Sequence, residues 1–331
     1  MLSQEEWVAK MGPLLWNETS KVVFLNHKIA FWYLFISGLI AGLLNVAFLG
    51  IFVRYPKYLM TPSAIPEILV ILGDIGIAGL HPFSGSAAYY GWWIWQKPGC
   101  ILYGLFGYLF GTGMLVSVAF VAFDRYILTT KVLGHIRTTR NYLKISVFIF
   151  VYSAFWAVSP TLGWARYSRT PIGISCAVDW TDTSMSYYSY IMCYATASFV
   201  LPLAFGLMFY NRTLEHLAKN PLTRVHWTTF NNRKLTSYGC LFSGFICFSA
   251  FGVVSLWPFF AEAKTIPTGI NALPPLLAKG SGILNPIFYL RVKFYNNFLL
   301  CKNILIDTRT YIDSGIVTNF RNSATSKLIE R

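Results

Sequence analysis

A lysine stands in the middle of an apolar stretch of the sequence. Lys279 lies about halfway along a segment that runs from roughly residue 270 to residue 290. A lysine at the centre of a bilayer costs about 2.5 to 3.5 kcal/mol on insertion scales. A chain that retains this charge normally uses it as an ion partner, a proton carrier or a covalent anchor. A primary amine condenses with an aldehyde only in its neutral form, which an apolar environment favours.

The overall composition predicts a protein embedded in a membrane. Apolar residues make up 55% of the 331 residues, charged residues only 12%, and the mean hydropathy is +0.50, whereas soluble domains carry about 25% charged residues. Seven windows are apolar and long enough to span a bilayer; they lie near residues 30–53, 64–86, 100–128, 143–164, 186–210, 236–261 and 270–290. We therefore expect an all-α membrane protein, a bundle of seven transmembrane helices.

The distribution of basic residues predicts the orientation of that bundle. Lys and Arg number 27 against 13 Asp and Glu, a net charge of +14, and they concentrate after the first, third, fifth and seventh windows. Positive residues favour the cytoplasmic side, so we expect residues 1–29 outside the cell, a domain over 30–290 in the plasma membrane, and an amphipathic helix and tail over 291–331 inside. Residues 1–28 show no clean signal peptide. A nucleic-acid binder is the competing interpretation of the charge, but the sequence offers no soluble domain for it.

Four residues predict covalent modification. Asn17-Glu-Thr is a glycosylation sequon on the outer side. Cys100 and Cys176 also fall outside, where an oxidising environment favours a disulfide between them; two free thiols are the alternative. Cys301 follows a short amphipathic segment, a position that suits palmitoylation, although an unmodified surface thiol fits equally well.

Several motifs, in a fixed order, carry a resemblance to a known family. They are Cys100 at the start of the third window, Asp124-Arg125-Tyr126 at its end, Cys176-Ala-Val-Asp179-Trp180 in the following outer loop, and Asn285-Pro286-Ile-Phe-Tyr289 in the seventh window. Together they resemble rhodopsin-like G-protein-coupled receptors. A lysine six residues before the Asn-Pro pair is typical of opsins. Gly79-Leu-His-Pro-Phe-Ser-Gly-Ser and Leu277-Ala-Lys279 are similar to the group of peropsin, retinochrome and the retinal G-protein-coupled receptor, over about residues 30–300.

The resemblance implies that Lys279 binds retinal as a Schiff base. In the peropsin group the bound retinal is typically all-trans, and light converts it to 11-cis. The resemblance also implies that Phe248 and Phe251 occupy pocket positions, and that a heterotrimeric G protein and arrestin are candidate partners. A polyene needs a long apolar slot with aromatic walls.

The sequence has no acidic residue at the positions where opsins place the negative counterion of the Schiff base. Opsins place a glutamate at one of two sites, which here hold Tyr103 and Thr170, so we expect a largely unprotonated Schiff base. A bound chloride, or Tyr103 as a hydrogen-bond partner, is the alternative. His81 lies two helical turns beyond Asp74 on the same face and so could approach the Schiff base; a histidine packed against a backbone carbonyl is the alternative for it.

The resemblance assigns further polar residues to a signalling switch. The switch would consist of Asp124, Arg125, Tyr126, Asn285, Pro286 and Tyr289. A buried polar network would contain Asn45 and Asp74. Arg166 and Asp179 would form an ion pair in the outer loop. Asp124 is expected to hold Arg125 at rest. The family usually has tryptophan where Phe248 stands and proline where Ala250 stands, and no acid occurs near Phe230. A sixth helix without this proline should be straighter.

Three hypotheses follow. The first is a photoisomerase of the peropsin type that binds all-trans-retinal, and in that sense a light-driven enzyme. The second is a photoreceptor that signals through a G protein from an 11-cis dark state. The third is a receptor for a diffusible ligand in which Lys279 is only an ion partner, which would need an acid at the same depth.

Overall fold

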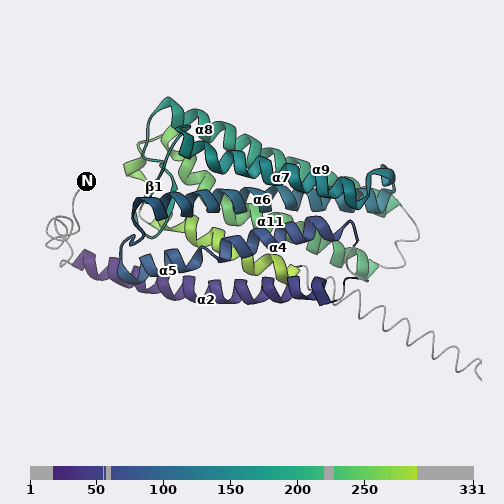
Figure 1. Ribbon diagram of the computed structural model, residues 1–331, viewed down its shortest axis with the longest axis horizontal. Helices are drawn as coiled ribbons and strands as arrows, with labels where there is room; N and C mark the ends of the chain where they lie inside the picture. The colour runs from purple at the N-terminus through teal and green to yellow at the C-terminus, as the bar shows by residue number, and fades with distance from the viewer. Residues whose placement is uncertain (1–17, 55, 57–60, 220–226, 268, 289–331) are drawn as a thin grey trace, which may run out of the picture.

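The computed structural model describes residues 18–54, 56, 61–219, 227–267 and 269–288, with the backbone alone for residues 18–26, 227–240, 242 and 264. This part of the chain is an all-helical membrane bundle whose seven segments run along a common axis (Figure 1). The segments are α2 (Glu18–Arg54), α4 (Ala64–Ala78) with α5 (His81–Tyr90), α6 (Gln96–Thr130), α7 (Thr139–Val158), α8 (Met185–Ala195) with α9 (Leu201–Lys219), α11 (Trp227–Leu256), and a helix over 269–288 that we call the Lys279 helix. The predicted fold class is therefore confirmed.

Length and composition support the membrane assignment. Among the described residues, five helical segments are long and apolar enough to cross a bilayer, and Ser243–Phe259 is a shorter apolar one. The first helix departs most from its predicted boundary, because α2 begins at Glu18 rather than near residue 30. The predicted apolar window begins after Lys21 and Lys28, because these residues are charged. Lysine is nevertheless a good helix former, so the helix can extend beyond the apolar window.

The second transmembrane segment is broken between α4 and α5, where the sequence predicted one continuous helix. Pro82 has no N–H to donate to the Ala78 carbonyl, the partner it would have in an α-helix. The His81 side chain supplies the missing donor, since its Nδ1 lies 3.0 Å from the Ala78 oxygen and 3.3 Å from the Ile77 oxygen. A carbonyl can only accept, so this contact assigns the proton to Nδ1. The sixth segment, in contrast, runs unbroken through Ala250, as expected for a helix without the proline.

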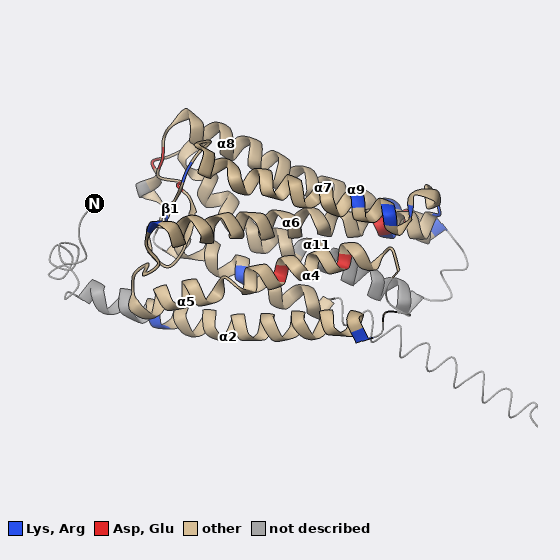
Figure 2. Ribbon diagram, in the orientation of Figure 1, with Lys and Arg blue, Asp and Glu red and all other residues tan. Residues whose placement is uncertain are grey.

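A small antiparallel sheet covers one end of the bundle. β1 (Tyr167–Arg169) pairs with β2 (Cys176–Val178), with Arg169 opposite Cys176. The predicted disulfide between Cys100 and Cys176 is present and ties β2 to the start of α6. We call this end the disulfide end, and the opposite end, where α4 begins and α9 ends, the Arg125 end. Figure 2 shows that charged residues gather towards the two ends and are sparse between them.

Candidate ligand cavity

An apolar cavity of about 420 Å³ lies beneath β2. Its walls come from α4, α6, α8, the π-helical turn η4 (Thr196–Val200), α11 and the Lys279 helix, and Cys176 and Ala177 of β2 form part of its boundary. Polar groups in the lining are few: Tyr103, Tyr108, Tyr194, Ser198, Ser249, Ser255 and Lys279. A mostly apolar cavity with a few placed polar groups is typical of a small-molecule site, and its volume falls in the usual range of about 300–1,000 Å³.

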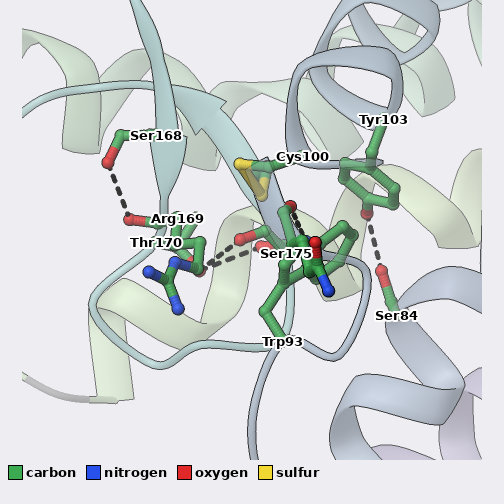
Figure 3. Close-up of a disulfide and its surroundings, with 10 residues drawn as sticks. Ser84, Trp93, Cys100, Tyr103, Ser168, Arg169, Thr170 and Ser175 are labelled. Carbon is green, nitrogen blue, oxygen red and sulfur yellow. Dashed lines mark hydrogen bonds between the residues drawn. A yellow bond between two sulfur atoms is a disulfide. The ribbon is translucent and has the colours of Figure 1, made fainter. Parts of the chain in front are cut away.

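The Lys279 side chain lies in this lining and is 3% exposed. Its Nζ donates to Ser84 Oγ at 2.9 Å and to the Tyr103 hydroxyl, and these two hydroxyl groups are 2.7 Å apart, so the three polar atoms form a triangle. Figure 3 shows the Tyr103–Ser84 bond beside the disulfide. None of the ion pairs in the described part of the chain includes Lys279. The amine is thus held by neutral hydroxyl groups.

Two aromatic residues named from the sequence, Phe248 and Phe251, also line the cavity. Gly111 of α6 makes room for the first of them, because a β-carbon at residue 111 would stand 2.9 Å from Phe248 Cε1. The rings therefore enter the cavity from α11 while Lys279 enters from the neighbouring helix.

His81 and Thr170, which the sequence also placed near the chromophore, are absent from the cavity lining. His81 is occupied by the Ala78 carbonyl, which Pro82 leaves without a donor, and by the neighbouring Ile77 carbonyl, the alternative that the sequence left open. Thr170 lies 5% exposed in the loop between the strands, where its Oγ1 bonds the Ser175 carbonyl at 3.2 Å and Ser175 Oγ at 3.1 Å. In Figure 3 this pair lies apart from Tyr103.

A second polar cluster lies deeper in the bundle, around Asp74. Asn285 Nδ2 donates to both carboxylate oxygens of Asp74, at 3.2 and 3.0 Å, and Asn285 Oδ1 accepts from Ser243 at 2.7 Å. Asn45 instead donates to the backbone oxygens of Ala41 and Gly282. The three residues of the expected network therefore form two separate sets of hydrogen bonds. Asp74 is bonded to Asn285, and Asn45 joins α2 to the Lys279 helix.

The expected ion pair between Asp124 and Arg125 is present at the Arg125 end, but Glu67 lies nearer to the arginine. Arg125 forms an ion pair with Glu67 of α4, and its distance to Asp124 is longer, 3.7 Å. Asp124 is 0% exposed and accepts hydrogen bonds from Ser63 at 2.8 Å and Tyr142 at 2.7 Å. Asp124 therefore anchors neighbouring segments, and Glu67 lies nearer to the arginine than Asp124 does.

The outer loop contains the expected ion pair. Arg166 Nε and Nη2 each lie 3.0 Å from Asp179 Oδ2. The hydrogen bond and the charge of Asp179 raise the pKa of the Arg166 guanidinium. Because the arginine side chain is 63% exposed, such a pair contributes little to stability.

Several residues named from the sequence fall outside the described part of the chain: Asn17, Tyr289 and Cys301. Conversely, Ser84 and Glu67 are not among the site residues predicted from the sequence. Both have a sequence signal, since each is a polar residue within the second apolar window, as Asp74 is. Without the fold, nothing shows which neighbouring segment each one faces.

The fold and the buried lysine define a class: a multi-pass membrane receptor with a ligand cavity inside the bundle. The family model "7 transmembrane receptor (rhodopsin family)" matches residues 45–289. The chain belongs to this family and, within it, to the opsins related to peropsin.

Individual relatives support this placement. Mouse (Mus musculus) "visual pigment-like receptor peropsin" is 31% identical over 274 residues, 80% of each chain. The human (Homo sapiens) "RPE-retinal G protein-coupled receptor" is 24% identical over 267 residues, which cover 79% of this chain and 84% of that protein. The crystal structure of squid rhodopsin is similar in fold, with a TM-score of 0.72 over 80% of this chain and 81% of that one at 20% identity.

Proposed function

We propose that this opsin binds retinal covalently through Lys279 as a Schiff base, holds it as the all-trans isomer in the dark, and isomerises it in light. The observation that carries the proposal is the buried Lys279 amine in the wall of an apolar, aromatic-lined cavity inside the bundle. Retinal would supply the light absorption and the double-bond isomerisation. The protein would bind it, orient it and exclude water.

The residues present fit such a ligand. An aldehyde needs a primary amine within an apolar site, and Lys279 is such an amine. Phe248 and Phe251 supply aromatic surface for a polyene, and β2 covers the cavity at the disulfide end. Ser84 and Tyr103 orient Lys279 Nζ. The choice of all-trans over 11-cis follows from the relationship to peropsin.

Reconstitution with retinal tests the proposal directly. Purified protein is incubated with all-trans- or 11-cis-retinal in the dark, trapped with borohydride and mapped by mass spectrometry. We expect an adduct on Lys279 that the Lys279→Ala variant lacks. Retinal extracted after illumination should be enriched in 11-cis. Equal labelling of the variant, or an 11-cis dark state that light turns to all-trans, would contradict the proposal.

A second candidate function, light-activated signalling through a G protein from an 11-cis dark state, is favoured by one observation. Asp124-Arg125-Tyr126 ends the third segment, and Arg125 is held by an ion pair of a kind that a conformational change could break. Light-driven nucleotide exchange on a heterotrimeric G protein, followed by arrestin binding, distinguishes this function from isomerisation alone. A receptor for a diffusible ligand lacks comparable support, because hydroxyl groups and not an acid hold Lys279, and Asp74 is bonded to Asn285.

The same proposal includes an orientation. The disulfide end would face outwards at the plasma membrane, with the N-terminus outside and a glycan on Asn17. The Arg125 end would face the cytoplasm, together with an amphipathic helix over the start of 291–331 and a palmitoylated Cys301. The disulfide at one end supports this assignment, because disulfides form in oxidising compartments.

A further inference from the structure

One hydroxyl group in the cavity wall has no hydrogen-bond partner among the residues that the structure describes. Ser198 lies in the turn η4, is 0% exposed and lines the cavity. Its Oγ makes no hydrogen bond to any described residue. A buried hydroxyl left unsatisfied costs about 1–3 kcal/mol, and hydrocarbon around the bundle offers no water to satisfy it.

The backbone explains why Ser198 differs from other buried hydroxyl residues. Ser117, Ser153 and Thr213 each donate to the carbonyl four residues earlier, at 2.6, 2.8 and 2.7 Å. Ser198 lies instead in a π-helical turn, in which the Leu201 N–H bonds the Thr196 carbonyl. The wider turn changes the alignment of the side chain with the preceding carbonyl. The Ser198 hydroxyl therefore remains available to a group inside the cavity.

A second hydroxyl enters the cavity from the same segment. Tyr194, four residues before Ser198, also lines the cavity, and its hydroxyl bonds Thr112 of α6 at 2.9 Å. One bond between two hydroxyl groups uses only one of their two protons, so this pair keeps a donor. Tyr194 and Ser198 together give the wall formed by the fifth segment a polar patch.

This patch and Lys279 come from opposite sides of the bundle. The Lys279 helix is bonded to α2 through Tyr33, which donates to the Leu276 carbonyl at 2.9 Å. In Figure 1, α2 and α8 lie at opposite edges with α6 between them. A ligand attached at Lys279 therefore extends towards Tyr194 and Ser198 with the end that is remote from its aldehyde.

Building on the proposed function, we propose that Ser198 and Tyr194 form a subsite for a hydroxyl group on the ring of the bound retinal. The preferred ligand is then a ring-hydroxylated retinal. Its hydroxyl both donates and accepts, so it satisfies the Ser198 Oγ in an otherwise apolar cavity. An unsubstituted ring leaves that hydroxyl without a partner.

The test compares all-trans-retinal with all-trans-3-hydroxyretinal and all-trans-4-hydroxyretinal on the full chain. Dark binding is measured by quenching of tryptophan fluorescence and by the fraction of Lys279 trapped with borohydride. One net hydrogen bond corresponds to a preference of about 2- to 12-fold for a hydroxylated ligand. Ser198→Ala should remove this preference, chiefly by weakening the hydroxylated ligand. Ser153→Ala, which removes a buried hydroxyl that is not in the cavity lining, should retain it.

The outcomes separate the subsite from the proposed function. Equal binding of all three ligands to the wild type, or a preference that survives in Ser198→Ala, overturns the subsite while leaving the Lys279 adduct intact. The absence of any Lys279 adduct with all three ligands overturns the proposed function, and the subsite with it. The melting temperature of each loaded variant provides a readout that is independent of light.

Discussion

Arg125 at the end of α6 is held by Glu67 of α4. Glu67 lies two helical turns before Asp74, so α4 presents one carboxylate to the arginine and another to Asn285. The sequence around Phe230 contains no acid that α11 could offer in place of Glu67. In this opsin the second segment therefore restrains the arginine, and outward movement of α11 alone leaves the ion pair in place.

Replacing Glu67 should release that restraint. We expect Glu67→Gln to lower the free energy of unfolding by about 1–2 kcal/mol, less than for a fully buried pair, because the Arg125 side chain is 30% exposed. Thermal unfolding of the purified protein measures the loss. Glu215→Gln, at an exposed position of α9, serves as the matched control. A double-mutant cycle with Arg125→Gln should show coupling; additive effects would contradict a direct interaction.

Loss of the disulfide should destabilise the chain. Cys100→Ser and Cys176→Ser remove a crosslink between residues 76 positions apart, and we expect a loss of about 2–5 kcal/mol. Differential scanning fluorimetry with and without reductant measures it. Cys193→Ser removes a free thiol and should leave stability unchanged. A reductant-insensitive wild type would show that the crosslink contributes nothing.

Tyr103→Glu should give a protonated Schiff base between retinal and Lys279, whereas Thr170→Glu should not. Wild-type protein with retinal should absorb in the near ultraviolet, because neutral hydroxyl groups surround Lys279. Tyr103→Glu places an anion beside the amine and should give a visible band. Thr170→Glu should not, since Thr170 bonds Ser175 outside the cavity lining. Absorption spectra across chloride concentrations check this, and a visible band in the wild type would contradict it.

His81 and Pro82 should behave as a coupled pair. His81→Ala removes the donor to the Ala78 carbonyl and should cost about 1–3 kcal/mol. In a Pro82→Ala background the new N–H can bond that carbonyl, so the same substitution should cost less. Thermal unfolding of the four proteins gives the coupling energy. Equal losses in both backgrounds would mean that His81 acts only through its packing against Gly38, where a β-carbon would stand 2.7 Å from His81 Cβ.

The sequence predicts the parts of this protein that depend on period, composition and motif spacing. The seven apolar windows, Lys279, and the Cys100–Cys176 bond all follow from such local signals. Other contacts between segments, formed by residues outside any motif, do not. Ser84 meets Lys279 across 195 positions and Glu67 meets Arg125 across 58, and each pairing depends on how two helices are rotated against each other. The π-helical turn at Thr196–Val200 also has no motif of its own.

Two residues of the cavity lining, Val200 and Val253, are each 53% exposed on the outside of the bundle. In a membrane that surface meets acyl chains, while β2 covers the cavity at the disulfide end. An apolar ligand that passes between η4 and α11 is therefore exchanged with the bilayer and not with water. The rate of ligand binding would then depend on the concentration of the ligand in the bilayer. The lipid composition of the membrane, which sets how strongly the ligand partitions into it, would therefore affect that rate.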